Sequence, residues 1–330
     1  MSVNVLRTRD GWWVENDGEA TRVPTSATTT AELLADRPAL ERARHGSGGV
    51  PVSGLRPLSP VTAPCRVVAQ MVNYRSHARD SGMDPGRVPP TFFRKSSGSV
   101  SGPYDPIEVP SHVGLLDYEV EIGLVLGAPL PVGATVTESD LPRLVAGLVV
   151  ANDVSARDVQ LSKGQFYESK SYPTFTPLGP HLTLLDPEDF ARLPDLRLTL
   201  AVNGQTRQDS TWDDMIVKPA RALTLLARFQ TLLPGDLLLT GTPGGTALKA
   251  PSPLVEKVGA LLPPEVKWRT FFARQARNPR YLRPGDRISA RVYSGDGLLD
   301  LGTQVTTVQA ARPPLSPPLN PPPSPAPVPS

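Results

Sequence analysis

Short apolar runs separated by glycine and proline recur along most of the chain. Six stretches predict strands, because each contains a short β-type run and they are separated by glycine and proline turns: CRVVAQMV, EVEIGLVLG, RLVAGLVVAND, LRLTLAVNG, GDLLLTG and DRISARVYS. Helical periodicity is rarer and is clearest in RALTLLARFQTLL. We therefore expect a mainly β domain of the α+β class over residues 61–311.

Residues 1–60 predict a small N-terminal domain and a linker. VNVLRT and WWVEN flank an Arg-Asp-Gly turn, which indicates a hairpin. The stretch TTTAELLADRPALERARH predicts one helix with threonines as capping candidates. GSGGVPVSGLRPLSP, which follows, has the composition of a loop.

Two segments near the C-terminus stand apart from the strand pattern. Within residues 244–282, EVKWRTFFARQA places Val266, Phe271 and Phe272 near Trp268 at helical spacing. We interpret it as an amphipathic helix that covers part of the main domain or forms a subunit contact. Residues 312–330 are proline-rich and predict a solvated, disordered tail, because proline joins neither a helix nor a strand ladder.

The stretch DYEVEIGLVLG, residues 117–127, places Glu119 and Glu121 two positions apart at the start of an apolar run. Strand alternation puts both on one face, about 6.6 Å apart along the strand, and apolar residues on the other. Carboxylates that close repel each other, more strongly where water is excluded. Either this face is wet, or a positive group lies between the two side chains.

Composition and charge exclude several classes of protein. The 330 residues are 39% hydrophobic and 20% charged, which is typical of a globular protein. The formal net charge of +2 gives no reason to expect nucleic acid or an anionic membrane as a partner. The single Cys65 excludes an intramolecular disulfide, and neither a signal peptide nor a membrane span is apparent, so we expect a cytoplasmic protein.

The chemistry is expected to depend on oxygen ligands. The chain lacks GxGxxG, GxxxxGK[ST], HExxH, CxxC and GxSxG, and it has only four histidines. A bound metal would therefore be Mg²⁺, Mn²⁺ or Ca²⁺. Asp153 ends the apolar run GLVVAND and is a third candidate ligand, although an aspartate there is also typical of a turn or cap.

Six blocks in a fixed order resemble the fumarylacetoacetate hydrolase superfamily: NYRSH, DYEVEIGLVLG, VAGLVVANDVSARDVQ, SKSYPTFTPLGP, VNGQTRQDSTWDDMI and PGDLLLTGTPGG. The resemblance covers residues 61–246 and resumes at YLRPGDRISARV. It implies a mixed β-sheet roll as the catalytic domain, which commonly forms a homodimer. It also implies one Mg²⁺ or Mn²⁺ held by Glu119, Glu121 and Asp153.

The same resemblance assigns roles to six further residues. Lys170 would stabilise negative charge on the substrate, and His77 would move a proton or activate water. Many relatives carry a glutamate where this chain has Asp80, whose shorter side chain leaves open whether it orients His77 or is an ordinary surface acid. The expected substrate-binding residues are Arg157, Gln160 and Thr242, for which a loop ion pair and a tight turn are the structural alternatives.

Three functions remain open from the sequence. The preferred one is a metal-dependent hydrolase that cleaves a C–C bond in acylpyruvate-like or fumarylacetoacetate-like oxo acids through a metal-stabilised enolate. The same site could instead decarboxylate, isomerise or hydrate related oxo acids of aromatic catabolism. The third is a non-catalytic member that binds a metal or ligand.

Overall fold

The computed structural model describes residues 2–46, 48–250 and 263–311, and its strands outnumber its helices. The strands are β1 Val3–Thr8, β2 Gly11–Asn16, β3 Glu19–Arg22, β4 Val50–Pro51, β5 Val67–Met71, β6 Thr91–Lys95, β7 Val100–Ser101, β8 Ile107–Val109, β9 Leu116–Asp117, β10 Val120–Leu126, β11 Val145–Asn152, β12 Ser155–Ala156, β13 Thr176–Pro177, β14 Leu182–Leu184, β15 Leu196–Val202, β16 Gln205–Thr211, β17 Leu237–Leu239, β18 Arg287–Ser294 and β19 Asp300–Ala310. The α-helices are α1 Thr30–Ala35, α2 Arg37–Arg44, α3 Arg75–Asp80, α4 Leu141–Leu144, α5 Arg157–Lys163, α6 Pro219–Leu226 and α8 Pro264–Gln275.

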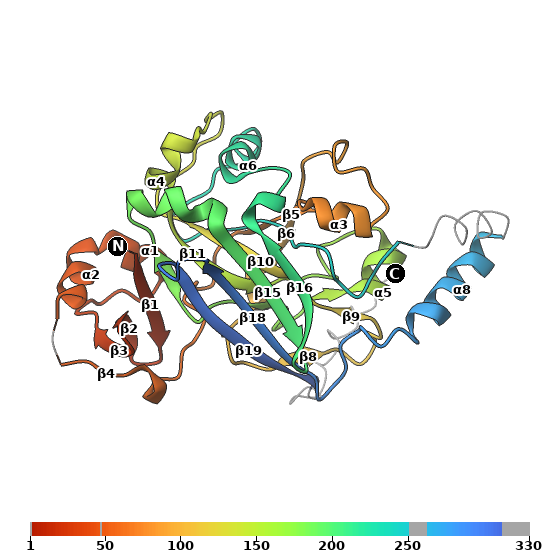
Figure 1. The fold of residues 1–330 in the computed structure, drawn as a ribbon, viewed down its shortest axis with the longest axis horizontal. Helices are drawn as coiled ribbons and strands as arrows, with labels where there is room; N and C mark the ends of the chain where they lie inside the picture. Colours follow the sequence, from red (N-terminus) through yellow and green to blue (C-terminus); the bar gives the residue numbers. More distant parts are fainter. Residues whose placement is uncertain (1, 47, 251–262, 312–330) are drawn as a thin grey trace, which may run out of the picture.

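Two mixed sheets form the body of the molecule. The larger sheet has the strand order β4-β3-β2-β1-β14-β11-β10-β17-β5-β6, and the smaller has the order β16-β15-β18-β19-β8. Strands β10 and β11 lie against β15, β18 and β19 of the smaller sheet, as Figure 1 shows. The expected α+β, mainly β fold is confirmed, with the two sheets rolled around a shared core.

The N-terminal residues continue the larger sheet at one end. Strands β1 and β2 form the predicted hairpin, and β1 also pairs antiparallel with β14 through Val5 and Leu182. Figure 1 shows β1–β4 with α1 and α2 at the end of the molecule opposite α3 and α5. A separate domain over residues 1–60 stays a prediction.

The prediction of a single helix after the hairpin is wrong, because the structure has two helices there, α1 and α2. Thr29 caps α1 in a capping box with Glu32, as its threonine signal indicated. Helix α1 ends at Ala35, and the side chain of Asp36 then caps α2, whose first turn contains Pro38. Proline lacks the N–H that a helix interior needs and restricts the residue before it, so the chain restarts there.

The alternation predicted in residues 117–127 is present, and both faces are buried. Val120, Ile122 and Leu124 belong to the core shared with the smaller sheet. On the other face Val125 joins the second core, which α1 and α2 cover. Both faces of β10 are buried, so Glu121 does not lie on a solvent-exposed strand face.

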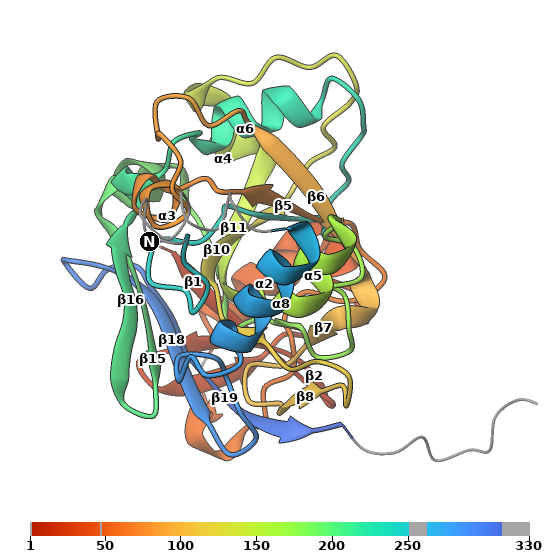
Figure 2. The ribbon, with the colours of Figure 1, turned by 90° about the vertical axis from the view of Figure 1, so that its right-hand side faces the viewer.

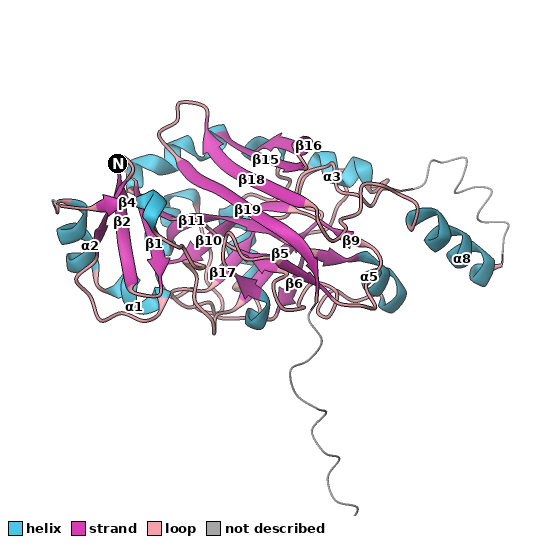
Figure 3. Cartoon of the chain, turned by 90° about the horizontal axis from the view of Figure 1, so that it is seen from below, coloured by secondary structure: helices cyan, strands magenta, loops and turns pink. Residues whose placement is uncertain are grey.

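The predicted helix within residues 244–282 is α8. Trp268, Phe271 and Phe272 form an aromatic cluster with ring centroids 5.6–5.8 Å apart, but only Phe272 packs against the core, while Trp268 is 46% exposed. Figures 1 and 3 show α8 extending from the body, and Figure 2 shows it in front of the body along that direction. The predicted tail of residues 312–330 lies outside the described residues.

Within the described residues, every helix is too short or too polar to cross a membrane. The cytoplasmic location stays a prediction.

Strand β11 requires a glycine at position 147. A Cβ atom there would lie 2.4 Å from the carbonyl oxygen of Thr183 on β14, closer than such atoms approach. We expect Gly147→Ala to lower the free energy of unfolding by about 1–3 kcal/mol, since the two central strands must move apart. Urea denaturation of this variant and of Gly54→Ala, whose Cβ meets no atom within 4 Å, checks the prediction. Equal stability of the two variants would contradict it.

Candidate functional site

Two neighbouring strand ends bring three carboxylates together. Glu119 lies between β9 and β10, Glu121 lies in β10, and Asp153 follows β11. Strands β10 and β11 pair antiparallel, so the start of one meets the end of the other. The N–H of Asp153 donates to the carbonyl of Glu119 at 2.8 Å, and the N–H of Glu119 donates to Oδ1 of Asn152 at 2.9 Å. The backbone therefore fixes these side chains close together.

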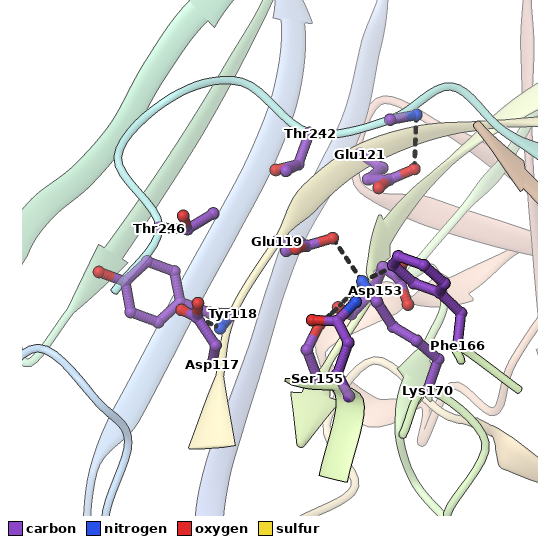
Figure 4. A network of polar contacts seen from close by, with 12 residues as sticks. Asp117, Tyr118, Glu119, Glu121, Asp153, Ser155, Phe166, Lys170, Thr242 and Thr246 are labelled. Carbon is purple, nitrogen blue, oxygen red and sulfur yellow. Dashed lines mark hydrogen bonds and ion pairs between the residues drawn. The ribbon is translucent and has the colours of Figure 1, made fainter. Parts of the chain in front are cut away.

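The three carboxylates form a compact, buried group of oxygen ligands. One oxygen from each of Glu119, Glu121 and Asp153 lies within 4.8 Å of the others, and the side chains are no more than 6% exposed. Figure 4 shows the three side chains close together, with the ammonium of Lys170 beside Glu119 and Asp153. The structure thus brings together the residues predicted as metal ligands.

Lys170 and Arg157 compensate Glu119 and Asp153. The ammonium of Lys170 donates to Oε2 of Glu119 at 2.6 Å and to Oδ2 of Asp153 at 2.7 Å. The guanidinium of Arg157 donates from Nη2 to Oε1 of Glu119, so both oxygens of this carboxylate have a cationic donor. Both cations are themselves buried, and each was predicted from the sequence.

Sequence reasoning missed Lys95 and Asp117. The ammonium of Lys95 donates to Oδ1 of Asp153 and, at 2.8 Å, to the carbonyl of Phe175. Asp117 accepts from Nε of Arg157 at 2.9 Å and from the N–H of Ala247 at 2.8 Å. The alternation that singled out Glu119 and Glu121 also places Asp117 on their face, so that signal could have found it.

The pKa shifts distinguish Glu119, whose negative charge is balanced by neighbouring cations, from Glu121, whose negative charge is not. Burial alone would raise the pKa of Glu119, but Lys170 and Arg157 outweigh it and hold the pKa at about 2. Burial raises the pKa of Glu121 well above its ordinary value, and the charges of Asp153 and Glu119 raise it further. Glu121 accepts one backbone hydrogen bond, from Gly241 at 2.7 Å, and no described cation contacts it.

Burial and the neighbouring carboxylates also shift the pKa values of the two buried lysines. Burial lowers the pKa of Lys170, but Asp153 and Glu119 outweigh it and raise the pKa overall. Burial also lowers the pKa of Lys95, and here the attraction of Asp153 only partly opposes the shift. The three carboxylates are buried together, and no described cation contacts Glu121. Such a group of oxygen donors is what Mg²⁺ and Mn²⁺ prefer. The residues present therefore fit a divalent cation.

The predicted substrate-binding residues have different surroundings. Nη1 of Arg157 donates to Oε1 of Gln160 at 2.9 Å, so the first turn of α5 links this pair to the carboxylates. The hydroxyl of Thr242 donates to the carbonyl of Val120 at 2.9 Å and accepts from Nε2 of Gln208 at 2.8 Å. These bonds hold the 241–246 loop against β10. Substrate binding by Arg157, Gln160 and Thr242 stays a prediction.

The predicted pairing of His77 with Asp80 is absent from the structure. Both residues lie on α3, but Oδ2 of Asp80 accepts from the N–H of Gly245 at 2.9 Å, and the carboxylate pairs with Lys249 at 3.1 Å. Nδ1 of His77 is buried and has no hydrogen-bond partner among the described residues. Burial lowers the pKa of His77, although Glu119 opposes the shift. The imidazole is therefore neutral near pH 7 and able to accept a proton.

An aromatic wall borders Lys170. The rings of Phe93 and Phe166 stack with centroids 5.1 Å apart, and Nζ of Lys170 lies 5.3 Å from the centroid of Phe93. Figure 4 shows Phe166 beside Lys170 and Asp153. This wall limits access of water to Lys170 and strengthens its pairing with the carboxylates.

The sequence of this chain matches a family model and the sequences of named proteins. Residues 66–309 match the family model described as "Fumarylacetoacetate (FAA) hydrolase C-terminal". The rat protein named "Oxaloacetate tautomerase Fahd2a, mitochondrial" is 38% identical over 217 residues, which cover 64% of this chain. The chain thus spans just under two thirds, 66%, of that relative's length.

Solved structures match over nearly the whole chain. A probable 2-hydroxyhepta-2,4-diene-1,7-dioate isomerase from Mycobacterium abscessus is 29% identical with a TM-score of 0.70, covering 95% of this chain and 100% of its own. A fumarylacetoacetate hydrolase from Exiguobacterium antarcticum is 26% identical with a TM-score of 0.66, covering 94% and 100%.

The uncompensated Glu121 predicts a pH-dependent stability. Because its folded-state pKa is raised, the metal-free protein should lose free energy of unfolding as the pH rises above the ordinary glutamate pKa of about 4.3. Glu121→Gln removes this loss, so the variant should become increasingly more stable than the wild type between pH 5 and pH 8. Urea denaturation with a chelator measures it.

Added Mn²⁺ provides the second half of this test. At about 100 times its Kd, Mn²⁺ should stabilise the wild type by about 2.7 kcal/mol and Glu121→Gln by much less. The exposed Glu138→Gln is the matched control and should behave as the wild type. The same pH dependence in wild type and Glu121→Gln would contradict the charge balance described above.

Proposed function

The chain belongs to the fumarylacetoacetate hydrolase family, and from this membership and the site geometry we propose that it is a divalent-metal-dependent tautomerase. Its substrate would be a 2-oxo dicarboxylic acid of the oxaloacetate type, whose keto and enol forms it interconverts. The name of the rat relative supports the substrate class, and that of the M. abscessus structure supports isomerisation.

One observation carries the choice of tautomerisation over hydrolysis. Glu119, Glu121, Asp153 and Lys170 are assembled as a group, whereas Asp80 is bound to Gly245 and Lys249 and does not orient His77. Keto–enol exchange needs charge stabilisation and one proton carrier. Hydrolysis also needs an activated water, for which a carboxylate-oriented histidine is the usual device.

Glu119, Glu121 and Asp153 would hold Mg²⁺ or Mn²⁺, which supplies Lewis-acid polarisation of the substrate's oxo and carboxylate oxygens. Lys170 places a fixed positive charge beside the oxygen at C2, where negative charge develops when C3 loses a proton. The neutral imidazole of His77 accepts that proton and then donates it to the oxygen at C2, which completes the enol and restores the neutral imidazole. Atoms balance, because a single proton moves from carbon to oxygen.

Arg157 and Gln160 would contact the substrate's carboxylate, although Arg157 already donates to Asp117, Glu119 and Gln160. Its remaining N–H groups provide the planar donor geometry that a carboxylate accepts. Cleavage of a C–C bond in acylpyruvates is the second candidate, favoured by the buried Nδ1 of His77, which has no partner among the described residues, and by the name of the E. antarcticum relative. A non-catalytic binding protein and a homodimer also stay open as predictions.

Activity assays separate these functions. With Mg²⁺ or Mn²⁺, the wild type should accelerate the loss of enol absorbance of oxaloacetate, and Glu121→Gln and Lys170→Met should each lower kcat/KM by at least about 100-fold. The exposed Lys267→Met should leave it unchanged. Cleavage of acylpyruvates without enol–keto exchange would replace the tautomerase with the hydrolase. Mn²⁺ binding with no turnover of either substrate would favour the binding protein.

The separation of His77 from Asp80 predicts unequal effects on tautomerisation. Asp80→Asn keeps an oxygen that can accept from Gly245 and loses only the charge, so kcat/KM should stay within about threefold of the wild type. His77→Gln removes the proton carrier and should lower kcat/KM by about 100-fold or more. Steady-state kinetics with oxaloacetate measures both. Equal losses would show that the two residues act as a pair and would restore the water-activation mechanism.

A further inference from the structure

Lys95 is a buried cation to which neither the sequence motifs nor the proposed reaction gives a role. It is the last residue of β6, at the edge of the larger sheet, and its side chain is fully enclosed. Its ammonium donates to Oδ1 of Asp153 and, at 2.8 Å, to the carbonyl of Phe175. Both of its hydrogen bonds are to protein groups, so we assign it no direct contact with a substrate.

The charge of Lys95 decides the net charge of the site. Four carboxylates are linked in one network, those of Asp117, Glu119, Glu121 and Asp153. Three cations contact them, Lys95, Arg157 and Lys170. A bound divalent cation favours the ionised form of Glu121, and the four carboxylates, the three cationic side chains and the bound ion then sum to one positive charge. Without Lys95 the loaded site would be neutral.

We propose that Lys95 is a positioning residue that lowers the affinity of the site for its divalent cation and, in exchange, keeps the loaded site cationic toward a dianionic 2-oxo acid. The identity of the anion rests on the proposed function, whereas the effect of Lys95 on metal affinity does not. Lys95 acts through Asp153 and through its electric field, which is weakly screened in a buried site.

The two effects have opposite signs, which distinguishes this role from a structural one. Removing a unit positive charge next to Asp153 strengthens attraction of the carboxylates for a cation, and it weakens attraction of the loaded site for an anion. A residue that merely supported the fold or oriented Asp153 would weaken both when lost. Lys170 and Arg157 do not allow this separation, because both are candidates for direct contact with the substrate.

Two variants separate the charge of Lys95 from its hydrogen bond. Lys95→Met removes the charge and the donor, whereas Lys95→Gln removes the charge and keeps an amide donor for Asp153. Calorimetric titration of the metal-free, full-length protein with Mn²⁺ should give a Kd about tenfold or more lower for both variants than for the wild type. Lys267→Met, which removes an exposed lysine of α8, should leave the Kd unchanged. Circular dichroism confirms that each variant is folded.

Oxalate provides the anion arm, since it is a planar dianion that mimics the enolate of a 2-oxo acid. Its affinity for the Mn²⁺-saturated protein should fall about tenfold in both variants. Unchanged or weaker Mn²⁺ binding in both folded variants would overturn the proposal. Weaker Mn²⁺ binding in Lys95→Met that Lys95→Gln restores would also overturn it, because Lys95 would then act only by orienting Asp153.

Failure of the proposed function gives a different result. If the wild type binds Mn²⁺ and oxalate but does not exchange enol and keto forms, the tautomerase is wrong, and the opposite shifts in the Lys95 variants still support its electrostatic role. If both Lys95 variants bind Mn²⁺ more tightly but bind oxalate as the wild type does, Lys95 does not promote anion binding and that part of the proposal is wrong. The proposed tautomerase function is unaffected by this result.

Discussion

The cost of burying carboxylates is the constraint on which the site depends. Removing an ionised group from water costs several kcal/mol, and an attractive partner compensates it only with good geometry. Here Glu119 and Asp153 each have a cationic donor at both oxygens. Lys95, Arg157 and Lys170 together offset the cost of burying these two acids. Glu121 is the exception, because no cationic side chain among the described residues donates to it, and a bound divalent cation would supply the missing positive charge.

The fold meets this constraint by placing charged groups at strand ends, where backbone groups are free to bind them. Gly241 donates to Glu121, and Ala247 donates to Asp117, so the loop after β17 supplies N–H donors to two of the acids. Thr242 and Gln208 hold this loop against β10. The packed strands supply the rigidity. A Cβ atom at Gly123, two residues after Glu121, would lie 2.7 Å from Cγ1 of Val149 on β11.

The sequence predicted the parts of the site that follow from strand periodicity and from ordered motifs. Glu119, Glu121, Asp153 and Lys170 come together as expected, because a strand face and a strand end determine where they point. Lys95 could not be found in this way. A lysine at the end of a strand is ordinarily solvated, and only the packing of β6 against residues 153 and 175 encloses this one.

Helix boundaries and side-chain partners were harder to predict for a related reason. The break between α1 and α2 depends on a local competition between Pro38 and the helical pattern around it, which periodicity alone does not resolve. The spacing of His77 and Asp80 allowed a pair on one helix face. The N–H of Gly245, 165 residues away, binds Asp80 instead. Contacts between distant segments decide such cases, and they are not visible in local sequence.

These observations divide the site into two parts with different mechanical supports. The group that would hold the metal and stabilise the enolate is built on β10, β11 and their ends, deep in the larger sheet. The group that would move the proton is on the short helix α3, which the 241–250 loop holds through Ser76 and Asp80. Enolate stabilisation is common to tautomerisation, decarboxylation and C–C hydrolysis, whereas the handling of protons and water distinguishes them. On the proposed function, changes in α3 and this loop would alter the reaction of this chain while the carboxylate group stays constant.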